Sequence, residues 1–204
     1  KHILRAQYVE GGELPGYRTE PGIRVDSQTE TYADAKLFIN NWRWRGVPFY
    51  LRSGKRLKRK VSEIAITFKH VPHSIFPQLT SSELEPDVLV LNVQPEEGMA
   101  LSIQAKQPGP RLCMGRLTLK FNYADTFGGN IPEAYERLLL DSMLGDQTLF
   151  IRSDIIAASW RLFSPVLEAW QANTAPLYTY KAGSEGPDEA NRLFGKSGYF
   201  WREL

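Results

Sequence analysis

Apolar and polar residues alternate along several stretches of the chain, which is typical of β-strands with one buried face. Four such stretches cover residues 64–68, 89–93, 99–105 and 117–123. The aromatic run VPFYLRS is bounded by glycines and predicts a further strand, and we also assign TYADAKLFIN to a strand. Short connections between these strands predict a mostly antiparallel sheet.

The apolar spacing changes to that of helices in the last third of the chain. Pro132 favours the start of a helix, and Gly145 favours its end. A second stripe consists of Ile156, Trp160, Phe163, Leu167 and Trp170. Pro165 interrupts it, which predicts a kink or two abutting helices, and a short final helix is expected after Pro187. Strands followed by helices predict an α+β fold, with one large sheet and helices packed on one face.

Composition narrows the class of protein. The chain has 204 residues, of which 42% are hydrophobic, and this suits one globular domain or at most two small ones. A single cysteine excludes a disulfide framework within the chain and favours a reducing compartment. No apolar stretch approaches the length of a membrane span. The chain begins at Lys1 without a methionine, so we interpret it as a fragment of a longer protein.

Several residues that could carry chemistry have simpler explanations. His70 and His73 lack the further ligands that a metal site needs, so we interpret them as loop residues. Cys113 lies in a strand pattern and is expected to be a buried, inert thiol. Asp34 and Asp154 are possible bases, but Asp154 follows Ser153 and is better explained by helix capping and first-turn charge.

The most informative feature is a dense positive charge beside the aromatic strand. Residues 52–60 carry six basic side chains and no acidic one, while the net charge of the whole chain is only +2. Lys55 and Lys60 flank a turn after Gly54, and a lysine ammonium group suits a phosphomonoester. The same charges also suit a solvated loop. Trp42 and Arg43 would serve a nucleic-acid site, but acid-rich segments leave no obvious basic face.

Three long motifs in the right order carry a resemblance to a known family. They are DSQTETYADAKLFINNWRWRGVPFYLRSGKRLKRKVSEIAITFK, then NVQPEEG, then AYERLLLDSMLGDQTLFIRSDIIAASWRLFSPVLEAW. From about Gln7 to Trp201 the chain resembles the C-terminal domain of glucose-6-phosphate dehydrogenases. The resemblance implies that residues 1–204 form this one domain and that a dinucleotide-binding domain precedes it.

The resemblance also implies an activity and a division of labour. Such enzymes oxidise glucose 6-phosphate to the lactone with NADP, in the oxidative pentose phosphate pathway. Their catalytic histidine and main NADP site would lie upstream of Lys1, so no catalytic residue is expected in this chain. Lys55, Lys60 and, more weakly, Gln94 are the expected substrate contacts.

The resemblance sets expectations for cofactor and partners as well. Some family members hold a second, structural NADP on this domain. Arg52 and Trp201 would belong to that site, but the small residues Ala100 and Ser102 stand where larger ones are expected, so we predict no structural nucleotide. We expect a cytoplasmic homodimer or homotetramer that assembles through the sheet and binds neither nucleic acid nor membrane. The alternative is a purely structural or assembly module that binds no ligand when isolated.

Overall fold

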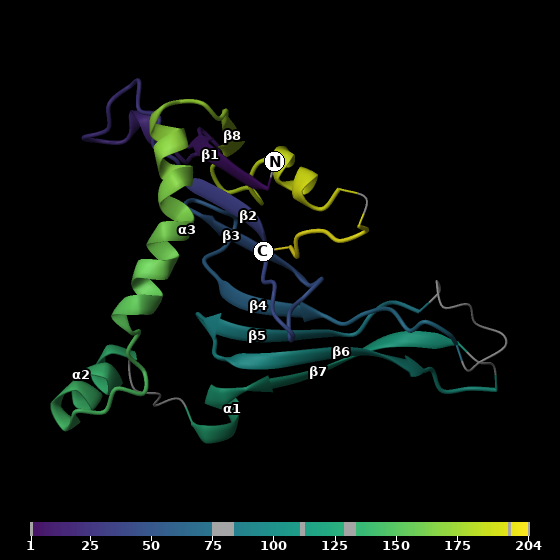
Figure 1. The fold of residues 1–204 in the computed structure, drawn as a ribbon. Coiled ribbons are helices and arrows are strands. Elements are labelled where there is room, and N and C mark those ends of the chain that lie inside the picture. The colour runs from purple at the N-terminus through teal and green to yellow at the C-terminus, as the bar shows by residue number, and fades with distance from the viewer. Residues whose placement is uncertain (1, 75–83, 111–112, 129–133, 196, 204) are drawn as a thin grey trace. The chain divides into compact units, whose positions relative to one another are not determined.

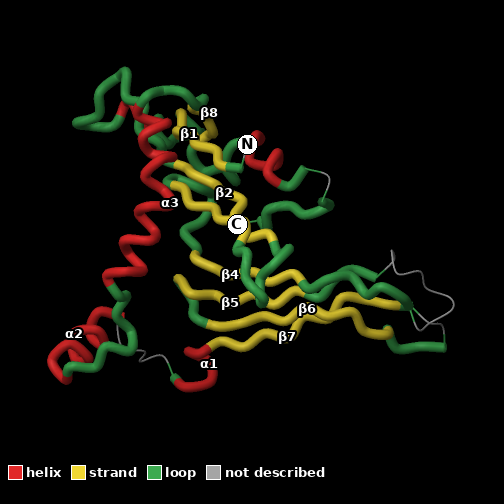
Figure 2. Tube along the Cα trace, viewed as in Figure 1, coloured by secondary structure: helices red, strands yellow, loops and turns green. Residues whose placement is uncertain are grey.

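The chain forms two compact units in a computed structural model, which describes residues 2–74, 84–110, 113–128, 134–195 and 197–203. The first unit combines Lys1–Arg59 with Phe150–Leu204, and the second is Lys60–Leu149. Figure 1 shows the course of the chain, and Figure 2 shows its helices and strands.

The first unit is built on a four-stranded sheet in the order β3-β2-β1-β8. Its strands are β1 (Ile3–Val9), β2 (Tyr32–Phe38), β3 (Pro48–Gly54) and β8 (Leu177–Lys181). The β1–β2 and β2–β3 pairs are antiparallel, whereas β1 and β8 are parallel. The two ends of the chain therefore meet in one sheet.

Tyrosine rings dominate the core of the first unit. The buried cluster consists of Ala6, Tyr8, Tyr32, Tyr180, Ala182 and Ala190. The Tyr180 ring lies 5.5 Å from that of Tyr32 and 6.2 Å from that of Tyr8, centre to centre. A buried tyrosine requires a partner for its hydroxyl group, so this core also fixes nearby polar groups.

The second unit contains the strands that alternation predicted. Its sheet has the order β4-β5-β6-β7, and all three pairs are antiparallel. The strands are β4 (Ser62–Thr67), β5 (Val88–Gln94), β6 (Gly98–Lys106) and β7 (Met114–Asn122). A β-bulge at Ser62 and Glu63 shifts the β4–β5 register.

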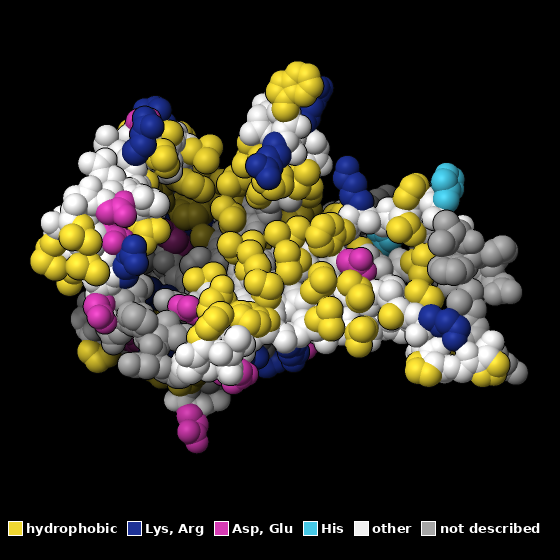
Figure 3. Space-filling view, turned by 90° about the horizontal axis from the view of Figure 1, so that it is seen from below, with side chains coloured by type: hydrophobic (Ala, Val, Ile, Leu, Met, Phe, Trp, Pro, Cys, Tyr) yellow, Lys and Arg dark blue, Asp and Glu magenta, His cyan; other side chains and the backbone are white. Residues whose placement is uncertain are grey.

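One face of the second sheet is continuously apolar. The strand register aligns Ile64 and Ile66 of β4, Leu89 and Leu91 of β5, Met99, Leu101 and Ile103 of β6, and Leu117, Leu119 and Phe121 of β7. Ile64 and Leu119 are each more than half exposed. Hydrophobic side chains cover much of the surface seen in Figure 3.

The helices are α1 (Tyr123–Phe127), α2 (Ala134–Leu144) and α3 (Ser153–Gln171), with short 3-10 helices η1 (Tyr17–Thr19) and η3 (Asp188–Leu193). Gly145 follows α2 with φ 75°, in the left-handed region that glycine favours, as its predicted role as a helix end requires. In α3 the predicted stripe is buried at Trp170 but exposed at Trp160. None of the helices in the described part of the chain has the length and apolarity needed to cross a bilayer.

The α+β class and the mostly antiparallel pairing are confirmed, but several details differ from the predictions. The described strands form two four-stranded sheets instead of one large sheet. Pro165 lies inside a single helix, so there are no two abutting helices at that point. Arg152, not Ser153, is the N-cap of α3, and its guanidinium binds Asp154 in the first turn. Pro132 lies outside the described residues.

Candidate functional site

The end of β3 places Lys55 on a rigid backbone. The Lys55 N–H donates to the Thr31 carbonyl oxygen at 2.8 Å, and the Tyr180 hydroxyl donates to the Lys55 carbonyl oxygen at 2.6 Å. The Lys55 side chain remains exposed. Gly54 is needed here because a Cβ atom would lie 2.8 Å from Tyr32 and 2.9 Å from Leu57. The glycine therefore makes room for the Tyr32 and Leu57 side chains at the end of β3.

The turn after Lys55 is fixed to the C-terminal part of the first unit. Arg56 adopts φ 51°, which is uncommon for a residue other than glycine, and its carbonyl accepts from the Gly183 N–H at 2.7 Å. The Lys58 N–H donates to the Ser184 carbonyl at 2.8 Å, and the Lys58 ammonium lies 3.1 Å from Glu185. Lys58 is therefore a paired residue, not a free loop charge.

An acidic residue partly neutralises the positive charge beside Lys55. Glu20 accepts from the Tyr8 hydroxyl at 2.7 Å and pairs with the Arg56 guanidinium at 3.2 Å. The Tyr8 hydrogen bond, then the Arg56 interactions and the Lys55 charge, hold the pKa of Glu20 below its usual value. Glu20 is thus ionised at neutral pH and pairs with Arg56, whereas no ion pair of Lys55 is found among the described residues.

The structure brings the other two predicted contacts to one end of the second sheet. Lys60 stands two residues before Ser62, and Ser62 pairs with Gln94 across β4 and β5. Both Lys60 and Gln94 are exposed, and a cis peptide bond joins Gln94 to Pro95. Lys55 belongs to the first unit, whereas Lys60 and Gln94 belong to the second. Lys60 and Gln94 therefore stand near the same end of the β4–β5 pair.

The residues expected at a structural nucleotide form a cavity of about 140 Å³. The Arg52 guanidinium lies 4.8 Å from the centre of the Trp201 ring, and both residues line the cavity. The charged lining residues are Arg52, Arg202, Glu185, Asp188 and Glu203. Three acidic groups against two basic ones do not fit a nucleotide phosphate. Ala100 and Ser102 lie on β6 of the second unit, so the absence of a structural NADP stays a prediction.

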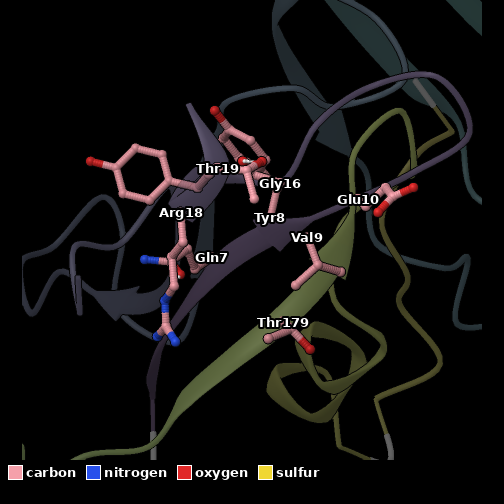
Figure 4. A pocket seen from close by; sticks show the side chains of 9 residues that line it. Gln7, Tyr8, Val9, Glu10, Gly16, Arg18, Thr19 and Thr179 are labelled. Atoms are coloured by element: carbon pink, nitrogen blue, oxygen red, sulfur yellow. Dashed lines mark hydrogen bonds between the residues drawn. The ribbon is translucent and has the colours of Figure 1, made fainter. Parts of the chain in front are cut away.

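A second hollow, of about 250 Å³, lies beside β1 and β8 (Figure 4). Two of its polar side chains already have partners: the Arg18 Nε donates to the Gln7 Oε1 at 2.8 Å, and the Gln7 amide donates to the carbonyls of Ser27 and Thr29. These bonds hold the loop around η1 on the sheet. The hollow is therefore explained by loop packing and is not part of the candidate site.

The remaining sequence candidates contribute no site. No group of three or more His, Cys, Asp or Glu residues that could hold a metal occurs within the described ranges. Cys113 is exposed just before β7, so the prediction of a buried thiol was wrong. Before β3, the Trp44 ring lies 5.3 Å from the Phe49 ring, centre to centre, whereas Trp42 is fully exposed.

Comparison with known proteins resolves the identity of the family. The family model described as "Glucose-6-phosphate dehydrogenase, C-terminal domain" matches residues 1–202. This chain belongs to that family. The glucose-6-phosphate 1-dehydrogenases of Chlamydia pneumoniae and Treponema pallidum are 44% and 42% identical to it, over 99% and 98% of the chain.

Solved glucose-6-phosphate dehydrogenases share the fold. A structure of such an enzyme in complex with its substrate glucose-6-phosphate has a TM-score of 0.87 and 33% identity over 98% of the chain. The Mycobacterium avium enzyme has a TM-score of 0.79 and 35% identity over 99% of it. The chain covers only 41% of the Chlamydia pneumoniae protein and 41% of the substrate-bound structure.

Sequence reasoning missed the groups that fix the Lys55 backbone. Thr31 and Tyr180 are 149 positions apart, and their hydroxyl groups lie 3.1 Å from each other. No periodicity links such distant residues, because the parallel β1–β8 pair that brings them together is itself long-range. The acidic neighbour of the turn, Glu20, was also missed, since it lies in a loop rich in glycine and proline.

Proposed function

We propose that this chain is the substrate-binding and assembly domain of a full-length glucose-6-phosphate dehydrogenase. The enzyme would oxidise glucose 6-phosphate to 6-phosphogluconolactone with NADP, and NADP would bind mainly to a domain outside this chain. The family match over residues 1–202 carries the proposal, and the glucose-6-phosphate complex of the similar solved enzyme supports it. The cytoplasmic location remains a prediction.

Within this function, the proposed substrate contacts are Lys55 of the first unit and Lys60 and Gln94 of the second. A phosphomonoester carries nearly two negative charges at neutral pH, so an exposed ammonium attracts it strongly. Lys60 has fewer local constraints than Lys55, since it precedes β4 on an exposed backbone. The Gln94 amide, at the end of the paired strand, can donate to a sugar oxygen and accept from a sugar hydroxyl.

The test replaces Lys60 in the full-length enzyme and measures KM for glucose 6-phosphate by NADP reduction. Loss of one charge-assisted hydrogen bond costs about 1.5–3 kcal/mol, so Lys60→Ala should raise KM by about tenfold to a hundredfold. Lys60→Arg should restore it only partly, because a planar guanidinium does not reproduce a compact ammonium.

Arg59→Ala is the matched control, because Arg59 is the adjacent exposed charge. Lys58→Ala is less suitable, since it would also break the contact with Glu185. An equal rise in KM for the Arg59 and Lys60 variants would mean that the basic residues 52–60 attract the substrate through their summed charge. Lys60 would then make no specific contact with it. An unchanged KM in both variants would mean that these residues belong to a solvated loop without a role in substrate binding. Absence of glucose 6-phosphate oxidation by the full-length protein would reject the proposed function itself.

The alternative is an assembly module without ligand affinity of its own, and the apolar face of the second sheet favours an assembly role. An open face of this kind is typical of a subunit interface, so we propose a homodimer or homotetramer that associates through it. Calorimetric titration of the isolated chain with glucose 6-phosphate separates the two functions, because only a binding domain gives a saturable signal.

A further inference from the structure

A C-terminal segment, described for residues 182–195 and 197–203, lies against one face of the first sheet. The Phe194 ring lies 4.6 Å from the Tyr50 ring of β3, and the Trp201 ring lies 5.2 Å from Phe194, centre to centre. Leu193 and Phe194 are buried. The face beneath this segment contains Tyr50 and Arg52 of β3 together with their register partners Lys36 and Asp34 of β2.

A single side chain ties both ends of this segment to β3. Arg52 donates from Nη1 to the Glu185 carbonyl at 3.4 Å and from Nη2 to the Arg202 carbonyl at 3.1 Å. Its guanidinium also lies 4.8 Å from the centre of the Trp201 ring. These contacts join residues 17 positions apart, so Arg52 is an anchor shared by both ends of the segment, in addition to the bonds that Gly183 and Ser184 make to the turn after Lys55.

A buried carboxyl group stands next to this guanidinium. Asp34 is only 2% exposed and is the register partner of Arg52. Its Oδ2 accepts from the Tyr32 hydroxyl at 3.3 Å, while Oδ1 has no hydrogen-bond partner of good geometry among the described residues, and the Leu4 backbone N–H lies near the carboxyl group. Burial of an ionised carboxylate with an unpaired oxygen is unfavourable in free energy. The surroundings of Asp34 therefore favour its neutral, protonated form.

Few groups can compensate a charge on Asp34. The titratable and charged residues around it are Tyr32 and Lys36 on β2, Arg52 on β3, Tyr180 on β8, and Glu185 and Arg202 on the C-terminal segment. Lys36 is directed to aromatic rings, since its Nζ lies 5.2 Å from the Tyr50 ring centre. Arg52 is therefore the cation that an ionised Asp34 would recruit.

We propose that Asp34 and Arg52 form a proton-controlled latch that fixes the C-terminal segment on the first sheet. With Asp34 protonated, Arg52 donates to the two carbonyls and the segment is docked. With Asp34 ionised, the carboxylate competes for Arg52, because a guanidinium binds a negatively charged carboxylate more strongly than a neutral carbonyl. The two ends of the segment then lose their common anchor.

The direction of the pH dependence follows from the environment of Asp34. Burial raises the pKa of Asp34 from 3.8 to about 7, and the Tyr32 hydrogen bond, the Leu4 backbone and the Arg52 charge only partly oppose this. A carboxyl with a raised pKa stabilises the closed state fully below its unfolded pKa and loses that contribution as pH rises through the folded pKa. The latch thus releases as pH rises towards and past about 7.

Hydrogen exchange on the full-length enzyme tests the latch. Peptides from residues 182–203 are followed at about pH 6 and about pH 8.5, with rates corrected for intrinsic exchange. Opening of the segment should increase about tenfold between these two pH values, because opening returns the pKa of the carboxyl from about 7 towards 3.8. In Asp34→Asn the increase should be less than about twofold, since the amide does not titrate.

Two further variants make the test decisive. Asp26→Asn is the matched control, because Asp26 is an exposed carboxyl of the same unit and should keep the full pH-dependent change. Arg52→Gln should exchange at the lower pH at least as fast as the wild type at the higher pH, because the clamp itself is lost. The latch is rejected if the wild-type segment opens equally at both pH values, if Asp34→Asn keeps the full change, or if Arg52→Gln stays closed at the lower pH.

Discussion

At the residue scale, Tyr180 links the core of the first unit to the substrate turn. Its hydroxyl lies 2.6 Å from the Lys55 carbonyl oxygen and 3.1 Å from that of Thr31, in a nearly water-free position. A buried carbonyl that loses its donor costs more than an exposed one, because water cannot replace the bond. This tyrosine therefore contributes to both stability and the position of Lys55.

Tyr180→Phe should lower the free energy of unfolding by about 1–3 kcal/mol and raise KM for glucose 6-phosphate, since Lys55 loses a backbone anchor. Urea unfolding and steady-state kinetics of the full-length enzyme measure the two effects. Tyr178→Phe is the control, because the Tyr178 hydroxyl only accepts a 3.3 Å bond from the exposed Arg192. Equal effects of the two substitutions would contradict the anchoring role.

At the scale of elements, the end of β3 is set by close packing around Gly54. A methyl group at this position would approach two side chains, Tyr32 and Leu57, to less than 3.0 Å. Gly54→Ala should therefore cost about 1–3 kcal/mol of stability, as overpacked sites do. Thermal unfolding measures it, and Ser53→Ala on the same strand is the exposed control. Unchanged stability would show that the turn can shift to make room.

Whether a strand could be predicted from the sequence depended on the types of residue on its two faces. β4 to β7 alternate cleanly because one face is apolar and the other polar. β1 was missed although Leu4, Ala6 and Tyr8 alternate with Arg5 and Gln7, and its buried polar residues could not be recognised as buried from the sequence. β8 is short, and its partner stands about 170 positions away, so local pattern gives little signal for it.

The candidate site was predictable only through the resemblance. Lys55 and Lys60 stand out as part of a basic run, but charge density alone does not separate them from Lys58. The pairing of Lys58 with Glu185 requires the fold, as does the register that sets Arg52 beside Asp34. Sequence patterns carry local periodicity, whereas these contacts arise from strands that are distant in the chain.

At the scale of the whole molecule, the chain should be inactive alone. Hydride transfer requires a bound nicotinamide and a general base, and the expected catalytic histidine lies outside residues 1–204. Purified chain mixed with glucose 6-phosphate and NADP should give no increase in absorbance from NADPH. Measurable reduction by this chain, above a blank without sugar phosphate, would overturn the proposed division between domains.

Assembly is the other property of the whole molecule. The apolar face of the second sheet should bury itself against a second copy, so Leu119→Glu should shift the full-length enzyme towards smaller species in sedimentation velocity. Lys120→Glu is the matched control, because the neighbouring residue of β7 points to the opposite face. If both variants sediment like the wild type, this face is not the interface.

The discontinuous first unit has a consequence for synthesis on the ribosome. β1 lies near the start of the chain, yet its parallel partner β8 begins at Leu177. The whole second unit, Lys60–Leu149, is therefore translated between the two halves of the first. Since its strands pair with their neighbours in sequence, the second unit can fold while β1 still awaits β8. The last strand to emerge thus completes the first sheet.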